Sequence, residues 1–175
     1  MPHPLERVPD QYRRPLLIAF LFLTLALFAV FRILDQPLRT DAAPNGIVSF
    51  ELAGSPGNSQ EMVSSWSPKG LLFAAFGLGL DYLFMPSYAL ALAFATLLVM
   101  QKHVGWIRSL GSLAGYGALA APLFDAVENY ALWKVLLGAF KSYYPLIAAA
   151  CATLKFGLLL FGLLIVLLGL VYPKK

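Results

Sequence analysis

Four long apolar runs set the strongest limit on how this chain can fold. A helix that crosses a bilayer needs about 20 mostly apolar residues, and each of the four runs reaches that length. The hydrocarbon core contains no water, so an open strand there would leave its backbone N–H and C=O groups unsatisfied. The sequence therefore predicts an all-α, four-transmembrane-helix bundle, with helices over residues 15–34, 69–100, 105–138 and 143–172.

Composition agrees with a membrane protein and excludes several other classes. Hydrophobic residues make up 59% of the 175 residues and charged residues only 13%, which is about half the charged share of a soluble domain. One cysteine and two histidines exclude a Cys/His zinc site. The sequence carries no phosphate-binding loop, dinucleotide fingerprint, nucleophile elbow or zinc-protease motif. We therefore expect no metal, no cofactor and no nucleic-acid partner.

The segment 35–68 is the one sizeable stretch outside the predicted membrane helices. Ser55 followed by Pro56 is typical of a helix start, and a short helix is predicted from there to about Trp66. Its apolar face consists of Met62, Val63 and Trp66. Such a helix would lie on the membrane surface or cap the bundle. The segment is too short for an independent domain, so residues 1–175 are predicted to form a single membrane domain with a structured outer loop.

Lysine and arginine are enriched on the cytoplasmic side of membrane proteins, so their distribution predicts the orientation. Seven of them fall on the side of the two termini and five on the other side. The seven are Arg7, Arg13, Arg14, Lys102, Arg108, Lys174 and Lys175, and the five are Arg32, Arg39, Lys69, Lys134 and Lys141. Both termini are therefore predicted to be cytoplasmic. The first run is longer than the core of a signal peptide and is predicted to remain as a membrane anchor.

Four charged side chains lie deep inside the predicted membrane helices, far from the helix ends, where charges are costly and usually face the interior. They are Asp81, Asp125, Glu128 and Lys155. A rise of about 1.5 Å per residue places them at a similar depth on three helices, in the outer half of the membrane. Three acids and one base would leave two excess negative charges, so Lys155 is expected to contact at least one of the acids.

Neighbouring residues extend this set into a predicted polar cluster. Asp125, Glu128 and Asn129 lie at positions i, i+3 and i+4, so they share one stripe of a helix. The stripe through Asp81 includes Tyr88. A polar cluster with aromatic and apolar surroundings would result.

Alternative interpretations of the cluster remain open at this point. Hydrogen bonds and an ion pair among these side chains would fasten the four helices together, as polar residues often do in membranes. Alternatively, Asp125 or Glu128 could perform acid–base chemistry on a lipid-like ligand, and contact with another subunit is a third use. Glu51, in an otherwise apolar part of the outer loop, could close the cluster from above.

The sequence also predicts the surroundings of one histidine and of two glycines. His103 lies in the short turn between the second and third predicted membrane helices, where it is expected to face solvent or lipid headgroups.

Gly111 and Gly115 are four residues apart, and small residues at this spacing let helix backbones approach closely. We expect both glycines to serve packing within the bundle.

Three short motifs remain: the runs 47–54 and 80–84 and the spacing Asp125-x-x-Glu128-Asn129. Together they resemble small, uncharacterised bacterial four-helix membrane proteins. The resemblance implies a bacterial inner-membrane protein and transfers no activity. We therefore expect a structural or accessory protein, or a subunit of a larger membrane complex, with the lipid bilayer and partner subunits as its surroundings. The alternative is a protein that binds a lipid-like ligand, or a membrane-embedded enzyme that uses the acid and lysine cluster.

Overall fold

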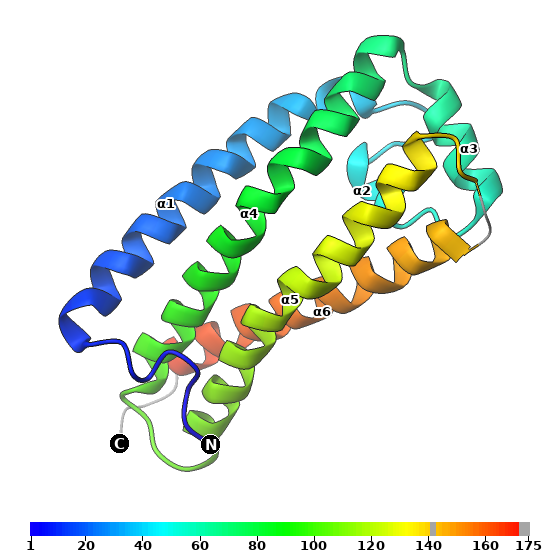
Figure 1. The fold of residues 1–175 in the computed structure, drawn as a ribbon. Helices are drawn as coiled ribbons and strands as arrows, with labels where there is room; N and C mark the ends of the chain where they lie inside the picture. Colours follow the sequence, from blue (N-terminus) through cyan, green and yellow to red (C-terminus); the bar gives the residue numbers. More distant parts are fainter. Residues whose placement is uncertain (141–142, 172–175) are drawn as a thin grey trace. The chain divides into compact units, whose positions relative to one another are not determined.

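The computed structural model describes residues 1–140 and 143–171, which form helices and connecting turns without a strand. The four long helices are α1 (Asp10–Leu34), α4 (Pro68–Met100), α5 (Trp106–Leu136) and α6 (Tyr143–Val171) (Figure 1). Three short helices connect α1 to α4, namely η1 (Gln36–Leu38), α2 (Ile47–Glu51) and α3 (Pro56–Ser65). The predicted all-α fold is confirmed.

All four long helices have the length and apolar composition that a membrane crossing requires. Helices α4, α5 and α6 agree with the predicted ranges to within two residues, although the predicted end at residue 172 lies outside the described residues. Helix α1 begins earlier than predicted, at Asp10 rather than Pro15. A negative charge in the first turn stabilises a helix because it interacts favourably with the positive end of the helix dipole. The Asp10 carboxylate supplies this charge at the start of α1, and it also pairs with Arg13. The chain therefore has the architecture of a multi-pass membrane protein.

The chain divides into two compact units, and each long helix contributes to both. Unit 1 comprises Met1–Leu25, Phe84–Pro122 and Lys155–Lys175, and unit 2 comprises Ala26–Leu83 and Leu123–Leu154. The predicted single-domain organisation of the chain stays a prediction.

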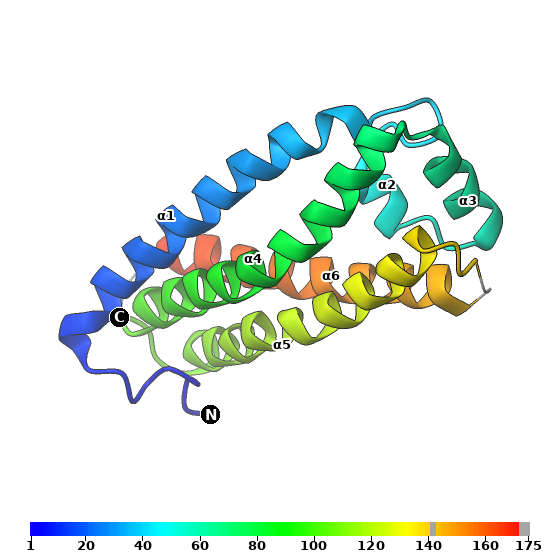
Figure 2. The same ribbon diagram turned by 45° about the horizontal axis from the view of Figure 1, so that its top comes forward.

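Unit 2 contains an apolar core to which α4, α5, α6 and the three short helices contribute. Its buried members include Leu38, Phe50, Trp66, Leu78, Leu132 and Val135. Met62 and Val63 of α3 pack against this core, so α3 caps it rather than lying apart from it. Figure 2 shows α2 and α3 beside the start of α4 and the end of α5.

The short helix α3 begins as predicted. The Ser55 side chain accepts a hydrogen bond from the Asn58 backbone N–H at 3.3 Å, and Pro56 is the first helical residue. At the other end of α3, the Trp66 indole N–H donates to the Leu38 carbonyl oxygen at 2.8 Å. The Trp66 ring also meets the Phe50 ring edge-on, with the ring centroids 5.2 Å apart. These contacts tie the segment between α1 and α4 to the core of unit 2.

The turn before α2 depends on Asp35. Its Oδ1 atom accepts a hydrogen bond from the Ile47 backbone N–H at 2.8 Å, and its Oδ2 atom pairs with Arg39 Nε at 2.9 Å. Gly46 packs directly against this carboxylate, so that a Cβ atom at position 46 would overlap it. Gly46 also has a φ of +58°, a region that L side chains avoid. Glycine is therefore required here for two separate reasons.

Smaller apolar clusters stabilise the described part of unit 1. One contains Leu92, Ala93 and Ala118, and another contains Met100, Ile107, Ala114 and Ile165. The Phe20 and Phe94 rings are stacked with their centroids 6.3 Å apart, which connects α1 to α4.

The expected exposure of His103 is wrong. Its side chain is only 3% exposed, and its Nε2 atom lies 2.8 Å from the Gly169 carbonyl oxygen. Gly169 is in the last turn of α6, where carbonyl groups have no partner within the helix. Since a carbonyl oxygen can only accept, His103 Nε2 carries the hydrogen and satisfies this helix end.

Gly111 and Gly115 are both positions of close approach, but they accommodate different parts of the chain. A Cβ atom at Gly111 would overlap the Met100 side chain of α4, in agreement with the prediction of close helix packing. At Gly115 the added atom would overlap the ring of His3. Gly115 therefore makes room for the N-terminal segment, which the spacing of small residues did not predict.

Candidate functional site

The polar stripe of α5 is buried along its whole length. The side chains of Asp125, Glu128 and Asn129 are 1%, 0% and 2% exposed. Leu132, one turn further along the same stripe, is equally buried. Buried carboxyl groups in apolar surroundings are costly unless hydrogen bonds compensate for the lost water. The role of this stripe therefore depends on the groups that it contacts.

Asn129 links α5 to α4 within unit 2. Its Nδ2 atom donates to Asp81 Oδ2 at 2.8 Å and to the Leu78 carbonyl oxygen at 3.2 Å. Both hydrogens of the carboxamide are therefore used on the neighbouring helix. A weaker contact lies close by, where the Tyr82 hydroxyl donates to the Ala126 carbonyl oxygen at 3.5 Å. Asp81 and Asn129, predicted as members of one cluster, are in direct contact.

Three other residues were predicted to belong to the cluster, namely Glu51, Tyr88 and Lys155. Glu51 is partly buried at the end of α2 in unit 2. Lys155 and Tyr88 belong to unit 1, and both are buried. The Lys155 ammonium lies 4.7 Å from the centroid of the Phe156 ring, at cation–π distance, and Tyr88 packs edge-on against Phe84. The predicted contact between Lys155 and one of the acids stays a prediction.

The Asp81–Asn129 pair can resist separation of α4 from α5. If the helices parted in lipid, the carboxylate and the carboxamide would lose their partner without gaining water. Across residues 1–140 and 143–171, no group of three or more His, Cys, Asp or Glu side chains could hold a metal ion. The chemistry that these side chains themselves supply is hydrogen bonding and proton exchange.

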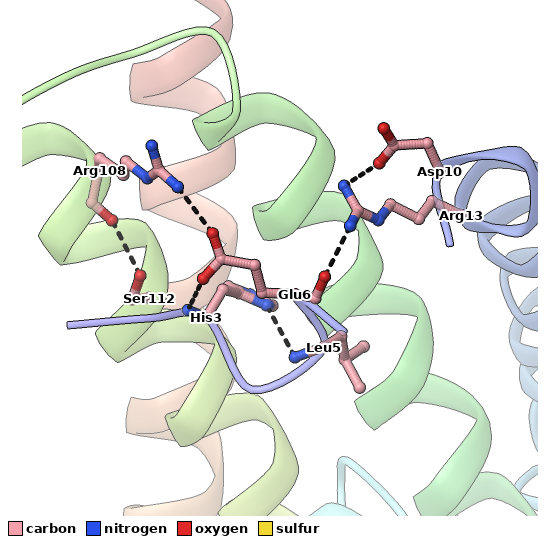
Figure 3. A network of polar contacts seen from close by, with 7 residues as sticks. All are labelled: His3, Leu5, Glu6, Asp10, Arg13, Arg108 and Ser112. Carbon is pink, nitrogen blue, oxygen red and sulfur yellow. Dashed lines mark hydrogen bonds and ion pairs between the residues drawn. The ribbon is translucent and has the colours of Figure 1, made fainter. Parts of the chain in front are cut away.

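A second polar network, in unit 1, was not predicted from the sequence. It holds the first residues of the chain against α4 and α5 (Figure 3). Glu6 Oε1 pairs with Arg108 of α5 at 2.7 Å, and Leu5 packs against the apolar cluster of Leu92, Ala93 and Ala118. Polar residues at irregular spacing have no helical or strand period, so the sequence offered no signal for this docking.

His3 is the buried centre of this network, with 7% of its side chain exposed. Its Nδ1 atom accepts a hydrogen bond from the Leu5 backbone N–H at 3.1 Å. In the neutral ring the hydrogen is then on Nε2, which lies 3.1 Å from Thr96 Oγ1. The Thr96 hydroxyl donates in turn to the Ala93 carbonyl oxygen at 2.9 Å. Every hydrogen in this chain of contacts has an acceptor when His3 is neutral.

The surroundings of His3 oppose its protonation. The pKa of His3 is lowered from 6.5 to about 4, mainly because the ring is buried; Glu6 raises the pKa and Arg13 lowers it, and both effects are smaller than that of burial. Arg13 is itself held in place, because it donates to the carbonyl oxygens of Val8 and Glu6, each at 2.7 Å. The start of α1 and the segment before it thus form one connected structure (Figure 3).

We expect the N-terminal segment to detach as the pH falls from about 6.5 toward 4. Docking requires neutral His3, whereas the free segment takes up a proton near the ordinary histidine pKa. Docking is therefore complete above pH 6.5 and weakens by up to about 1.4 kcal/mol per pH unit as the pH falls through this window. A spin label at Pro2→Cys, in a chain that also carries Cys151→Ser, should become more mobile at pH 5 than at pH 7.5. Equal mobility at both values would contradict the role of His3.

Two glycine variants provide the matched control for this experiment. Gly115→Ala should displace the His3 ring and make the label mobile already at pH 7.5. Gly157→Ala adds the same methyl group at a position with nothing within 4 Å, so the label should behave there as in the parent chain.

The described residues therefore include two polar networks that connect distant parts of the chain. The Asp81–Asn129 network joins α4 to α5 in unit 2, and the His3 network holds the N-terminal segment in unit 1. Comparison with protein-family models, with curated protein sequences and with solved structures finds no match for this chain.

Proposed function

We propose that the chain is a non-enzymatic structural or accessory protein of a bacterial inner membrane and acts as a subunit of a larger membrane complex. The observation that supports this role is the placement of Asn129, which uses both amide hydrogens on α4. Polar groups that satisfy one another between helices are typical of helix fastening in membranes. In this proposal the acidic residues of the cluster stabilise the fold and do not bind a substrate.

The proposal includes an orientation with both termini in the cytoplasm. It rests on the excess of seven lysines and arginines over five, with the cluster before α1 on the cytoplasmic side. The segment that contains α2 and α3 then lies on the outer side of the membrane. A reporter that is active only in the cytoplasm should work when fused to the C-terminus. Activity of a periplasmic reporter at that position would reverse the orientation without changing the fold.

Copurification tests the subunit role. Gentle detergent extraction followed by mass spectrometry should recover one or more membrane proteins in constant ratio to this chain. Recovery of a bound lipid-like molecule without protein partners would contradict the role. The variant Asn45→Ala, whose side chain is exposed in unit 2, should recover the same partners as the parent chain.

A second candidate is a pocket protein that binds or transforms a lipid-like ligand through Asp125 or Glu128. The burial of both acids favours it, because intramembrane carboxyl groups often mark functional sites. The isosteric changes Asp125→Asn and Glu128→Gln separate the two candidates, since they retain shape and hydrogen bonding but remove the acid. A structural subunit should keep its partners with either change, whereas a site that uses a proton should lose its activity.

A further inference from the structure

An open cleft in unit 1 lies between the start of α1 and the end of α4. Its volume is about 690 Å³. Arg14 of α1 and Lys102, in the turn after α4, line it, and Leu98 and Val99 form part of its apolar wall. All residues that line the cleft belong to unit 1, whereas Asp81 and Asn129 belong to unit 2.

The lining of this cleft is positively charged. Arg13, Arg14 and Lys102 contribute three positive charges and Asp10 one negative charge, which leaves +2. Arg13 is already occupied by Asp10 and by two backbone carbonyl groups. The side chains of Arg14 and Lys102 are exposed, and neither has a hydrogen bond or an ion pair with another described residue. Two cationic groups are therefore available to a ligand.

An exposed apolar stripe leads away from the cleft along α1. The side chains at four, seven, eight and eleven residues after Arg14 lie on the same face of the helix. They are Ile18, Leu21, Phe22 and Leu25, with exposed fractions of 67%, 45%, 73% and 59%. The basic residues of the cleft are complementary to the negatively charged phosphate of a phospholipid, and the apolar stripe is complementary to its acyl chains.

The position of the cleft agrees with the headgroup level of a membrane. Arg14 stands in the second turn of α1, immediately before the apolar run, and Lys102 lies two residues after the end of α4. At such positions the aliphatic part of a lysine or arginine side chain lies along apolar surface, while its charged group reaches the membrane interface. Basic pockets between membrane helices near the cytoplasmic face bind anionic lipid headgroups.

We propose that this cleft binds the phosphate group of an anionic phospholipid through Arg14 and Lys102, with the acyl chains lying along the exposed stripe of α1. A net charge of +2 favours a lipid with two phosphates over a lipid with one, and disfavours a zwitterionic lipid. This binding is independent of the role of the Asp81–Asn129 pair, so it stands or falls separately from the structural role proposed above.

The test measures lipid binding to the full-length chain in detergent by native mass spectrometry. The probes are cardiolipin, phosphatidylcholine and inorganic phosphate, added one at a time and in competition. Cardiolipin should bind at least tenfold more tightly than phosphatidylcholine. The double variant Arg14→Gln/Lys102→Gln should weaken cardiolipin binding by about thirty-fold, the effect expected for two basic residues near an anionic lipid.

Two further variants make the result decisive. Lys69→Gln/Lys134→Gln removes the same charge from unit 2, where each lysine lies over an aromatic ring, and it should leave cardiolipin binding unchanged. Arg14→Lys/Lys102→Arg retains both charges and should retain binding. Equal weakening by the Lys69 and Lys134 changes would overturn the assignment, because the attraction would then be unspecific. Inorganic phosphate that displaces cardiolipin at equal concentration would also overturn it, because the site would then take the free ion.

Discussion

Replacing Trp66 by alanine is expected to lower the free energy of unfolding of unit 2 by about 3–5 kcal/mol, the range for removing a large aromatic side chain from a core. The Trp66 side chain is 5% exposed and is part of the apolar core. Its loss also leaves the Leu38 carbonyl oxygen without the indole donor, and it removes the ring that packs on Phe50. The segment between α1 and α4 should loosen as a result.

The measurement is thermal unfolding of the purified chain in detergent, with Trp106→Ala as the matched control. Trp106 is 61% exposed, so the same substitution there should change the unfolding temperature little. Equal losses at both positions would show that the segment 35–66 does not depend on the Trp66 contacts.

Replacing Gly46 by alanine is the second change with a large expected effect. A non-glycine residue at positive φ costs about 1–2 kcal/mol, and the added Cβ atom would also displace the Asp35 carboxylate. The Ile47 backbone N–H would then lose its acceptor and Arg39 its partner, and loss of a buried hydrogen-bond partner costs about 1–3 kcal/mol. The two contributions together should lower the stability of unit 2 by about 2–5 kcal/mol.

The variant Gly54→Ala separates these contributions. Gly54 also has a positive φ, of +66°, but the nearest atom to an added Cβ atom is at an ordinary contact distance of 3.8 Å. It should therefore show only the backbone effect, measured by the same thermal unfolding. If Gly54→Ala destabilises the chain as much as Gly46→Ala, the Asp35 contact contributes nothing.

The long helices could be predicted because apolar length alone identifies a membrane crossing. The start of α3 could also be predicted, since Ser55 and Pro56 act within one turn. Helices α2 and η1 could not, because five and three residues are too few to show a helical period. Their formation depends on contacts from a distance, such as the Asp35 carboxylate that accepts the Ile47 N–H.

The candidate site shows the same division between local and distant information. The helical period predicted that Asp125, Glu128 and Asn129 share a stripe, and the rise per residue placed Asp81 at a matching depth. The two histidines could not be placed in this way. His3 meets Thr96 and His103 meets Gly169 only because a terminal segment and a turn fold back on distant helices. The spacing of residues in the sequence does not predict these long-range contacts.

The structural role of the Asp81–Asn129 pair is tested most directly by a double-mutant cycle with Asp81→Leu and Asn129→Leu. Each single change removes one partner of a hydrogen bond and should cost about 1–3 kcal/mol of unfolding free energy, whereas replacing both partners by apolar groups should be nearly neutral. The predicted result is therefore a coupling energy of about 1–3 kcal/mol, with the double variant close to the parent chain in stability. A double variant that is destabilised by the sum of the two single changes would contradict the role of this pair in fastening α4 to α5.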